Sequence, residues 1–431
     1  MLGKECIEVL VISPVVLLTE ESKGIQDQIR ESISHFQHLP SILHTFTFTV
    51  VCPCDVSFPS EEEIPEVYKL EHVKFIRVPP QPLLQFRQSN DYLVKLLEPV
   101  QMVGAVMNHY QKQNRLPDII HSYDWSTAYA AKCISLHYKK PWVFTCTLSN
   151  KRSAENVRRL NPAIQLEGVV DFASQLEEYA LYNADHIIHV SNSQAQYFEK
   201  IHLHKTNIVK NGIKIPEFLL GGKLDRSVVP NLPGYPENKK LLFLGRLTQQ
   251  KNLLELLKCK LPPNIDLIIA GPEDGIDGSV RVVLEQRLQG LKGLTGATSG
   301  LGLDEEKKQI DTFYVGAIYG ARKWQLLSAC DFVILPSLHE PFGLVALEAL
   351  AASTVVISSF VEGMAEFLDP SFAINCGTTQ ASIENALLIA NNMSIAEYKR
   401  RTDLGRQVAQ SFTWTKISKT LAAIYEYLHC L

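Results

Sequence analysis

The chain has 431 residues, more than one ordinary hydrophobic core accommodates, so its length favours two domains. Hydrophobic residues make up 46% and charged residues 20%, and 42 Lys and Arg nearly balance 46 Asp and Glu for a net charge of -4. These values are typical of a globular protein. The charge balance does not indicate binding to nucleic acid or to a strongly anionic membrane, and we expect no nucleic-acid partner.

Short apolar runs alternate with longer helical patterns along most of the chain. This alternation is typical of βαβ units and parallel sheets, so the predicted fold class is α/β with two doubly wound halves. The first half predicts strands at residues 7–13, 46–52, 118–121, 142–146 and 186–190, and the second half at 240–245, 265–271, 312–316, 331–336 and 354–359.

The apolar runs are shorter than the roughly 20 residues that a helix needs to cross a bilayer. The opening stretch "MLGKECIEVLVISP" carries Glu5 and Glu8, which predicts a first strand and not a signal peptide. Nine cysteines, an odd number, indicate reduced thiols. We therefore expect a cytoplasmic protein, with the inner face of the membrane as the second location considered.

Two irregular stretches interrupt the pattern. Residues 215–240 are rich in Pro, Gly and charge and predict a linker between the halves. Residues 290–308 predict a mobile surface insertion in the second half. The expected domains are therefore 1–214 and 215–411.

The motif "FLGRLTQQKNLLELL" contains two cations that follow a predicted strand. In an open parallel sheet, ligands bind beyond the carboxyl ends of the strands. Arg246 and Lys251 lie there with no acidic residue between them, a pattern that suits a diphosphate. A solvated loop explains the same residues, and the motif alone does not decide between the two.

The motif "LPSLHEPFGLVALEALAA" predicts a helix that begins beside the same crevice. Pro341 suits the first turn of a helix at about 342–352. The N–H groups of Phe342, Gly343 and Leu344 have no acceptor within such a helix and are suited to binding an anion.

This motif also carries two glutamates. Glu340 precedes the helix, and Glu348 lies two turns along it among apolar residues, where a carboxylate needs a partner. We favour the ribose diol of a nucleotide as the partner of Glu348, with a buried Arg or Lys as the alternative. For His339, contact with a sugar and a purely structural role are both open.

Together, "GRLxxxKN", "EPFGLVALEALA", "ADHIIHVS" at 184–191 and "VKNGI" at 209–213 resemble retaining nucleotide-sugar glycosyltransferases of the GT-B fold. The resemblance is to the GT4 family, the glycosyl transferases group 1, which are related to glycogen and starch synthases. It implies two Rossmann-like domains that face each other across a cleft. The first would bind the acceptor and the second the nucleotide sugar, and residues 412–431 would form a helix that packs back on the first domain.

The resemblance also implies a role for each matching residue. Arg246 and Lys251 would hold the donor diphosphate, Glu348 would bind the ribose, and Glu340 would face the donor sugar. "HSYDWSTA" resembles the acceptor-side "HxHDWxTA" segment of the synthases, which makes Asp124 a candidate for binding acceptor hydroxyls. The other implied nucleotide-binding positions are Gly24, Gly245, Phe342, Gly343 and Leu344.

The chain departs from the family pattern at several positions. The family's first loop usually has two adjacent glycines, of which Gly24 alone is present. Thr147 stands where the family often has a histidine beside the reacting sugar. The later pair of glycines is here Glu362 and Gly363.

The implied activity is transfer of a hexosyl group, with glucose from UDP-glucose as the first choice, to a saccharide or glycolipid hydroxyl in polysaccharide or glycoconjugate synthesis. Retention of configuration and independence of metals and other cofactors are expected. A nucleotide-sugar-binding pseudoenzyme, favoured by Thr147, and a nucleotide-sugar epimerase are the alternatives. The basic segment at 151–159 predicts a solvated face, with peripheral contact to an anionic acceptor or lipid surface as the less favoured interpretation.

Overall fold

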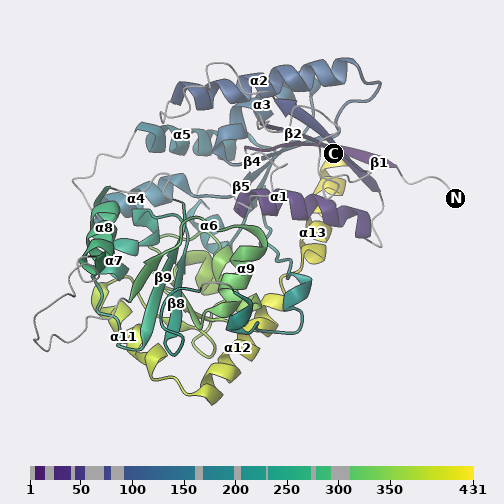
Figure 1. The fold of residues 1–431 in the computed structure, drawn as a ribbon. Coiled ribbons are helices and arrows are strands. Elements are labelled where there is room, and N and C mark those ends of the chain that lie inside the picture. The colour runs from purple at the N-terminus through teal and green to yellow at the C-terminus, as the bar shows by residue number, and fades with distance from the viewer. Residues whose placement is uncertain are drawn as a thin grey trace, which may run out of the picture. The chain divides into compact units, whose positions relative to one another are not determined.

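The computed structural model describes residues 5–14, 24–39, 44–53, 72–78, 92–160, 168–198, 205–229, 232–272, 278–292 and 311–431. The contacts divide the chain into two compact units (Figure 1). Unit 1 comprises Met1–Lys214 together with Phe412–Leu431, and unit 2 comprises Ile215–Ser411.

Unit 1 is built on a seven-stranded sheet whose paired strands are all parallel. The strand order is β3-β2-β1-β4-β5-β6-β7. Most of these strands are apolar and buried on both faces, as parallel strands covered by helices require. Their bounds are β1 Cys6–Ile12, β2 Thr45–Pro53, β3 Val73–Val78, β4 Ile119–Tyr123, β5 Trp142–Cys146, β6 His186–His189 and β7 Thr206–Ile208.

Helices cover both faces of this sheet. Alternate residues of β1 enter two different cores, since Val9 and Val11 pack with α1 and α13 whereas Leu10 packs with α2 and α3. In Figure 1 the yellow α13 lies beside α1, although the two are at opposite ends of the chain. The helices of unit 1 are α1 Gly24–Ser34, α2 Tyr92–Gln111, α3 Ala128–Tyr138, α4 Asn150–Leu160, α5 Gly168–Asn183, α6 Asn192–Tyr197 and α13 Trp414–His429, with short 3-10 helices η1 His35–His38 and η5 Trp125–Thr127.

Unit 2 repeats the design with a six-stranded parallel sheet, in the order β10-β9-β8-β11-β12-β13. Its strands are β8 Lys239–Leu244, β9 Ile265–Ala270, β10 Thr312–Tyr314, β11 Phe332–Leu335, β12 Val355–Ser358 and β13 Ile374–Asn375. Its helices are α7 Leu253–Lys258, α8 Gly278–Lys292, α9 Gly320–Ala329, α10 Leu344–Ala351, α11 Gln380–Asn391 and α12 Ile395–Gln410, with 3-10 helices η6 Glu217–Leu219, η7 Arg226–Val228, η8 Gln249–Lys251 and η9 Glu362–Glu366.

The predicted fold class is confirmed, since both units are α/β with parallel sheets. The ten predicted strands are present with small shifts at their ends. The sequence analysis missed β3, β7 and β13, each of which lies at an edge of its sheet. An edge strand is partly solvated, and β7 and β13 have only three and two residues, so none of the three carries a long apolar run.

The stretch predicted as a linker is packed against unit 2. Lys223 Nζ donates to the carbonyl oxygen of Cys330 at 2.5 Å, and Arg226 forms an ion pair with Asp331. Of the predicted surface insertion, residues 290–292 end α8, and residues 293–308 lie outside the described residues. In the part of the chain that the structure describes, none of the helices has the length and apolar character to cross a membrane.

Candidate active site

The loops that follow β8 and β11 are joined at the carboxyl edge of the unit 2 sheet. These two strands are neighbours, so their carboxyl ends meet. The backbone N–H of Leu338 donates to Gln250 at 2.9 Å, and Gln250 Nε2 donates to the carbonyl oxygen of His339 at 3.1 Å. Asn252, with a φ of 58°, donates its side-chain amide to the carbonyl oxygen of Pro336 at 3.1 Å. The two loops are therefore held in a fixed register.

Two of the predicted site residues form an ion pair there. Lys251 Nζ contacts Glu340 Oε2, and the two side chains are only 17% and 16% exposed. Low exposure strengthens their attraction and excludes water from around them. Arg246 is exposed, and its guanidinium lies 3.5 Å from Gln250 Oε1. Gly245 joins this loop to β8, and its N–H donates to the carbonyl oxygen of Ala270 at 3.0 Å.

The backbone of Glu340 is held from both sides by the segment that begins η9. Its N–H donates to Glu362 Oε2 at 2.9 Å, and its carbonyl oxygen accepts from the N–H of Gly363 at 3.2 Å. His339 is buried, and its Nδ1 lies 2.5 Å from Glu362 Oε2. The Glu362 carboxylate thus accepts a peptide N–H and is also in contact with an imidazole.

Helix α10 begins two residues later than predicted. Gly343 has a φ of 102°, a left-handed conformation that a right-handed helix cannot include, so the first helical residue is Leu344. A Cβ at Gly343 would lie 2.5 Å from Met364 Cγ, which leaves room only for glycine. Phe342 is buried against Phe367, with ring centroids 5.5 Å apart. The helix start has no side-chain cap.

Glu348 has a cation beside it within the protein. Lys323 Nζ, from α9, lies 2.7 Å from Glu348 Oε1, and both side chains are 12% exposed. The buried lysine that was the less favoured alternative is therefore present. A role for Glu348 toward a ribose stays a prediction.

Asp124 and Gly24 belong to unit 1. Asp124 follows β4 with a φ of 67°, and its Oδ1 accepts a hydrogen bond from the N–H of Trp125 at 2.6 Å. Gly24 is the first residue of α1, and residues 15–23, which directly precede it, lie outside the described ones. Thr147 follows β5, and its hydroxyl is buried without a hydrogen-bond partner among the described residues.

Glu177 on α5 is a buried carboxylate that the sequence analysis did not single out. It accepts hydrogen bonds from the N–H groups of Asn150 and Lys151 at 3.0 and 3.3 Å and therefore caps the start of α4. Burial raises the pKa of Glu177 to about 7, and the two N–H groups partly oppose this rise. The carboxyl therefore titrates near neutral pH.

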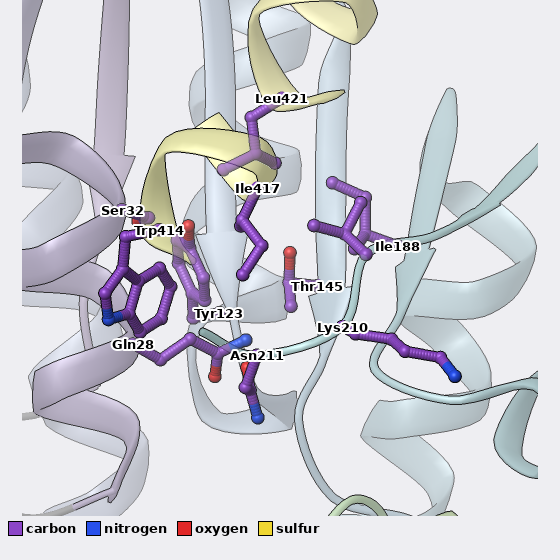
Figure 2. Close-up of a pocket in the computed structure, with 11 residues that line it drawn as sticks. Gln28, Ser32, Tyr123, Thr145, Ile188, Lys210, Asn211, Trp414, Ile417 and Leu421 are labelled. Carbon is purple, nitrogen blue, oxygen red and sulfur yellow. The ribbon is translucent and has the colours of Figure 1, made fainter. Parts of the chain in front are cut away.

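A small pocket in unit 1 lies between α1, α13 and the carboxyl ends of β4 and β5. Figure 2 shows Trp414, Asn211, Tyr123 and Thr145 around it. The space that it encloses, open solvent included, is about 240 Å³. Asn211 is buried, and its Oδ1 has no hydrogen-bond partner among the described residues.

The basic segment forms α4, and part of its charge is paired within unit 1. Lys151 forms an ion pair with Glu178, and Arg158 lies 2.6 Å from Asp171. These pairs agree with the interpretation of a solvated face. No group of three or more His, Cys, Asp or Glu side chains that could hold a metal ion occurs among the residues that the structure describes.

Residues 230–403 match the model of the family described as Glycosyl transferases group 1. Unit 2 contains a group 1 glycosyltransferase domain. The resemblance predicted from the motifs is thereby confirmed, and the match includes Arg246, Lys251, Glu340 and Glu348.

Similarity to known glycosyltransferases extends beyond this domain. The chain is 27% identical to the alpha-maltose-1-phosphate synthase of Mycolicibacterium smegmatis over 71% of its own length and 78% of that protein. It is 24% identical to a glycogen synthase of Mycobacterium tuberculosis, over 72% of the chain and 68% of that protein. These similarities support the predicted class of enzyme, a glycosyltransferase.

Two solved structures have the same fold over nearly the whole chain. Sucrose-phosphate synthase from Thermosynechococcus elongatus has a TM-score of 0.75 at 18% identity, covering 98% of this chain and 99% of that one. Anabaena Alr3699/HepE in complex with UDP-glucose has a TM-score of 0.66 at 16% identity, covering 98% and 100%. The fold is thus of the GT-B type.

Within the group 1 glycosyltransferase domain, the structure brings together Lys251, Glu340 and the start of α10. It also reveals two residues that the motifs did not identify as site residues, Lys323 and Glu362. Lys323 lies in an ordinary helical pattern that gives no signal. Glu362 did give a signal in the sequence, because a glutamate stands there in place of a glycine of the family pattern.

Proposed function

We propose that the chain transfers a hexosyl group from a nucleoside diphosphate sugar to a hydroxyl acceptor with retention at the anomeric carbon. The observation that carries this proposal is the low-exposure pair of Lys251 and Glu340, beside Arg246 and the uncapped start of α10. A donor of this kind carries a diphosphate and a hydroxylated sugar, and the site presents cations for the first and a carboxylate for the second.

On binding, the donor diphosphate would replace Glu340 as the ion-pair partner of Lys251. Two phosphates offer more negative charge than one carboxylate, so Lys251 and the exposed Arg246 would turn to the phosphate oxygens. The N–H groups at the start of α10 would add to this binding. Glu340 would then be available to the sugar hydroxyls, so that binding of one part of the donor prepares the contact with the other.

The reaction exchanges one glycosidic bond for another. The bond between the anomeric carbon and the diphosphate oxygen breaks, and the acceptor oxygen forms its bond to the same carbon on the same face. The proton of the acceptor hydroxyl passes to the departing phosphate, whose charge Lys251 and Arg246 stabilise. Since these cations neutralise the leaving group, we assign no step to a metal ion.

UDP-glucose is the donor that we place first. The Anabaena neighbour is described in complex with UDP-glucose, and the mycobacterial relatives are named for the synthesis of maltose 1-phosphate and glycogen. Asp124 is the residue we assign to the acceptor, a saccharide or glycolipid. A cytoplasmic location and the assignment of unit 1 to the acceptor and unit 2 to the donor belong to the same proposal.

A nucleotide-sugar-binding protein without turnover is the second candidate. Thr147 favours it, because a threonine cannot replace the imidazole that the family often places beside the reacting sugar. Such a protein would keep the contacts of Arg246, Lys251 and Glu348 with the nucleotide and lose the chemical step.

The test is release of nucleoside diphosphate from UDP-, ADP- and GDP-glucose in EDTA. We expect slow release from one donor, with water in place of the acceptor, and loss of release in Lys251→Met and Glu340→Gln. Lys258→Met is the matched control, because Lys258 pairs with Glu255 on the exposed face of α7. Binding without release would favour the non-catalytic candidate, and release that EDTA abolishes would contradict metal independence. Conversion of the sugar without release of nucleotide would identify an epimerase.

A further inference from the structure

We propose that Glu362 is a positioning residue that holds Glu340 in the orientation required to contact the donor sugar. The inference rests on the proposed function, because it assumes that Glu340 faces that sugar. Glu362 itself is assigned no contact with the substrate.

The backbone of Glu362 is strained. Its φ is 49°, in the left-handed region that side chains with a Cβ rarely adopt, and a glutamate is disfavoured there relative to glycine. Glycine would fit this conformation without strain. A contact that requires the glutamate side chain would explain why the strained backbone is tolerated.

That contact is made by the carboxylate. Glu362 Oε2 accepts the N–H of Glu340 at 2.9 Å and lies 2.5 Å from His339 Nδ1. The side chains of His339 and Glu362 are 3% and 8% exposed, so water does not replace either contact. An ionised acceptor makes a stronger hydrogen bond to a peptide N–H than a neutral one does.

The two contacts fix one peptide plane. The N–H that Glu362 accepts belongs to the peptide bond between His339 and Glu340, and the His339 ring contacts the same oxygen. On the following peptide, the carbonyl oxygen of Glu340 accepts from Gly363. A Cβ at Gly363 would lie 2.1 Å from the carbonyl oxygen of Pro341, so the two segments are in close backbone contact.

Both peptides that flank its Cα are held, the first by the Glu362 carboxylate and the second by the N–H of Gly363, so the direction of the Glu340 side chain depends on both contacts. Loss of the carboxylate would leave the buried N–H of Glu340 without an acceptor, and the loop would turn to satisfy it. The main consequence would be a misdirected Glu340, which affects sugar binding more than diphosphate binding.

The experiment compares the affinity for a nucleoside diphosphate sugar with the affinity for the bare nucleoside diphosphate, by titration calorimetry. The wild-type protein is first titrated with three pairs of ligands: UDP-glucose and UDP, ADP-glucose and ADP, and GDP-glucose and GDP. The pair that binds most tightly is then used for the variants. In Glu362→Gly, we expect about tenfold weaker binding of the sugar nucleotide and no weakening of the bare nucleotide. Glu362→Asn, which tolerates the left-handed conformation but has a shorter side chain, should show the same selective loss.

Glu362→Gln is the conservative variant, because its amide oxygen can still accept the N–H of Glu340. It should retain sugar binding to within about threefold of wild type. Lys139→Gly is the control for strain alone, since Lys139 has a φ of 53° at the exposed end of α3. It should leave both affinities unchanged.

Three results would overturn the inference. An unchanged ratio of the two affinities in Glu362→Gly and Glu362→Asn would leave the proposed function standing and remove the positioning role. Equal weakening of both ligands would indicate a general structural role for Glu362. If wild type binds no nucleotide of any pair, the proposed function and the inference fail together.

Discussion

Lys323 and Glu348 form an ion pair between adjacent helices, with Nζ and Oε1 2.7 Å apart and 12% of each side chain exposed. The carboxylate expected to bind a ribose is therefore also an element of the packing of α9 against α10. Its removal should affect both stability and ligand binding, and the two effects can be measured separately.

The first prediction concerns stability. Lys323→Met and Glu348→Gln should each lower the free energy of unfolding by about 1–2 kcal/mol, because each removes one member of a largely buried ion pair. The double variant should lose less than the sum of the two. Urea denaturation of all four proteins measures the coupling. Strict additivity would contradict the prediction, and the exposed pair of Lys258 and Glu255 should show a coupling below about 0.5 kcal/mol.

The second prediction concerns the ribose. Glu348→Gln should weaken nucleoside diphosphate binding by about ten- to a hundredfold, the loss expected for a hydrogen bond to a charged group. A 2′,3′-dideoxy analogue lacks the diol and should bind wild type and variant almost equally. Calorimetric titration with both ligands is the measurement. If the variant weakened both ligands alike, Glu348 would not contact the ribose.

The third prediction concerns the start of α10. Gly343→Ala should lower the free energy of unfolding by about 2–3 kcal/mol, because the new Cβ meets Met364 in addition to the strain of a left-handed backbone. Gly316→Ala is the control, since Gly316 has a φ of 74° and no atom of the described residues lies within 4 Å of an added Cβ. It should lose only about 1 kcal/mol. Equal losses would show that Met364 moves aside freely.

The fourth prediction concerns pH. The pKa of Glu177 rises from 4.5 in the unfolded chain to about 7 in the folded protein, so folding is favoured by its protonated form. The resulting stability is complete below pH 4.5 and is lost as the pH rises through 7. Relative to wild type, Glu177→Gln should gain about 3 kcal/mol in free energy of unfolding between pH 4 and pH 8.

Denaturation at several pH values measures this gain. Asp171→Asn, on an exposed position of the same helix, serves as the control for a change of charge. A difference between Glu177→Gln and wild type that does not vary with pH would contradict the raised pKa.

The central strands of both sheets were predictable from the sequence because they are buried on both faces and read as continuous apolar runs. β5 was predicted to the residue. The proximity of Lys251 and Glu340 was predictable because each follows such a strand, and the ends of neighbouring strands in a parallel sheet share one edge. The start of α10 was predicted too early, since Pro341 gave a stronger signal than the left-handed conformation of Gly343.

Contacts between side chains of different elements were not predictable. Lys323 reaches Glu348 only because α9 packs against α10, and no local pattern records that packing. The same holds for Glu362, whose position in the sequence was noted but whose contact with the N–H of Glu340 depends on the path of the chain after β12. The sequence therefore predicted which residues carry charge near the site better than it predicted their partners.

The discontinuity of unit 1 imposes an order on synthesis. Tyr425 on α13 bonds through its hydroxyl to the buried His121 of β4 at 2.6 Å, and Trp414 and Leu421 fill the same core. On the ribosome, these residues emerge only after the whole of unit 2 has been translated. The nascent chain must therefore carry an incomplete first core, in which α1 covers part of one face of the sheet and the place of α13 is empty, while unit 2 is already able to fold. During translation, unit 1 would therefore expose apolar surface to chaperones for longer than unit 2 does.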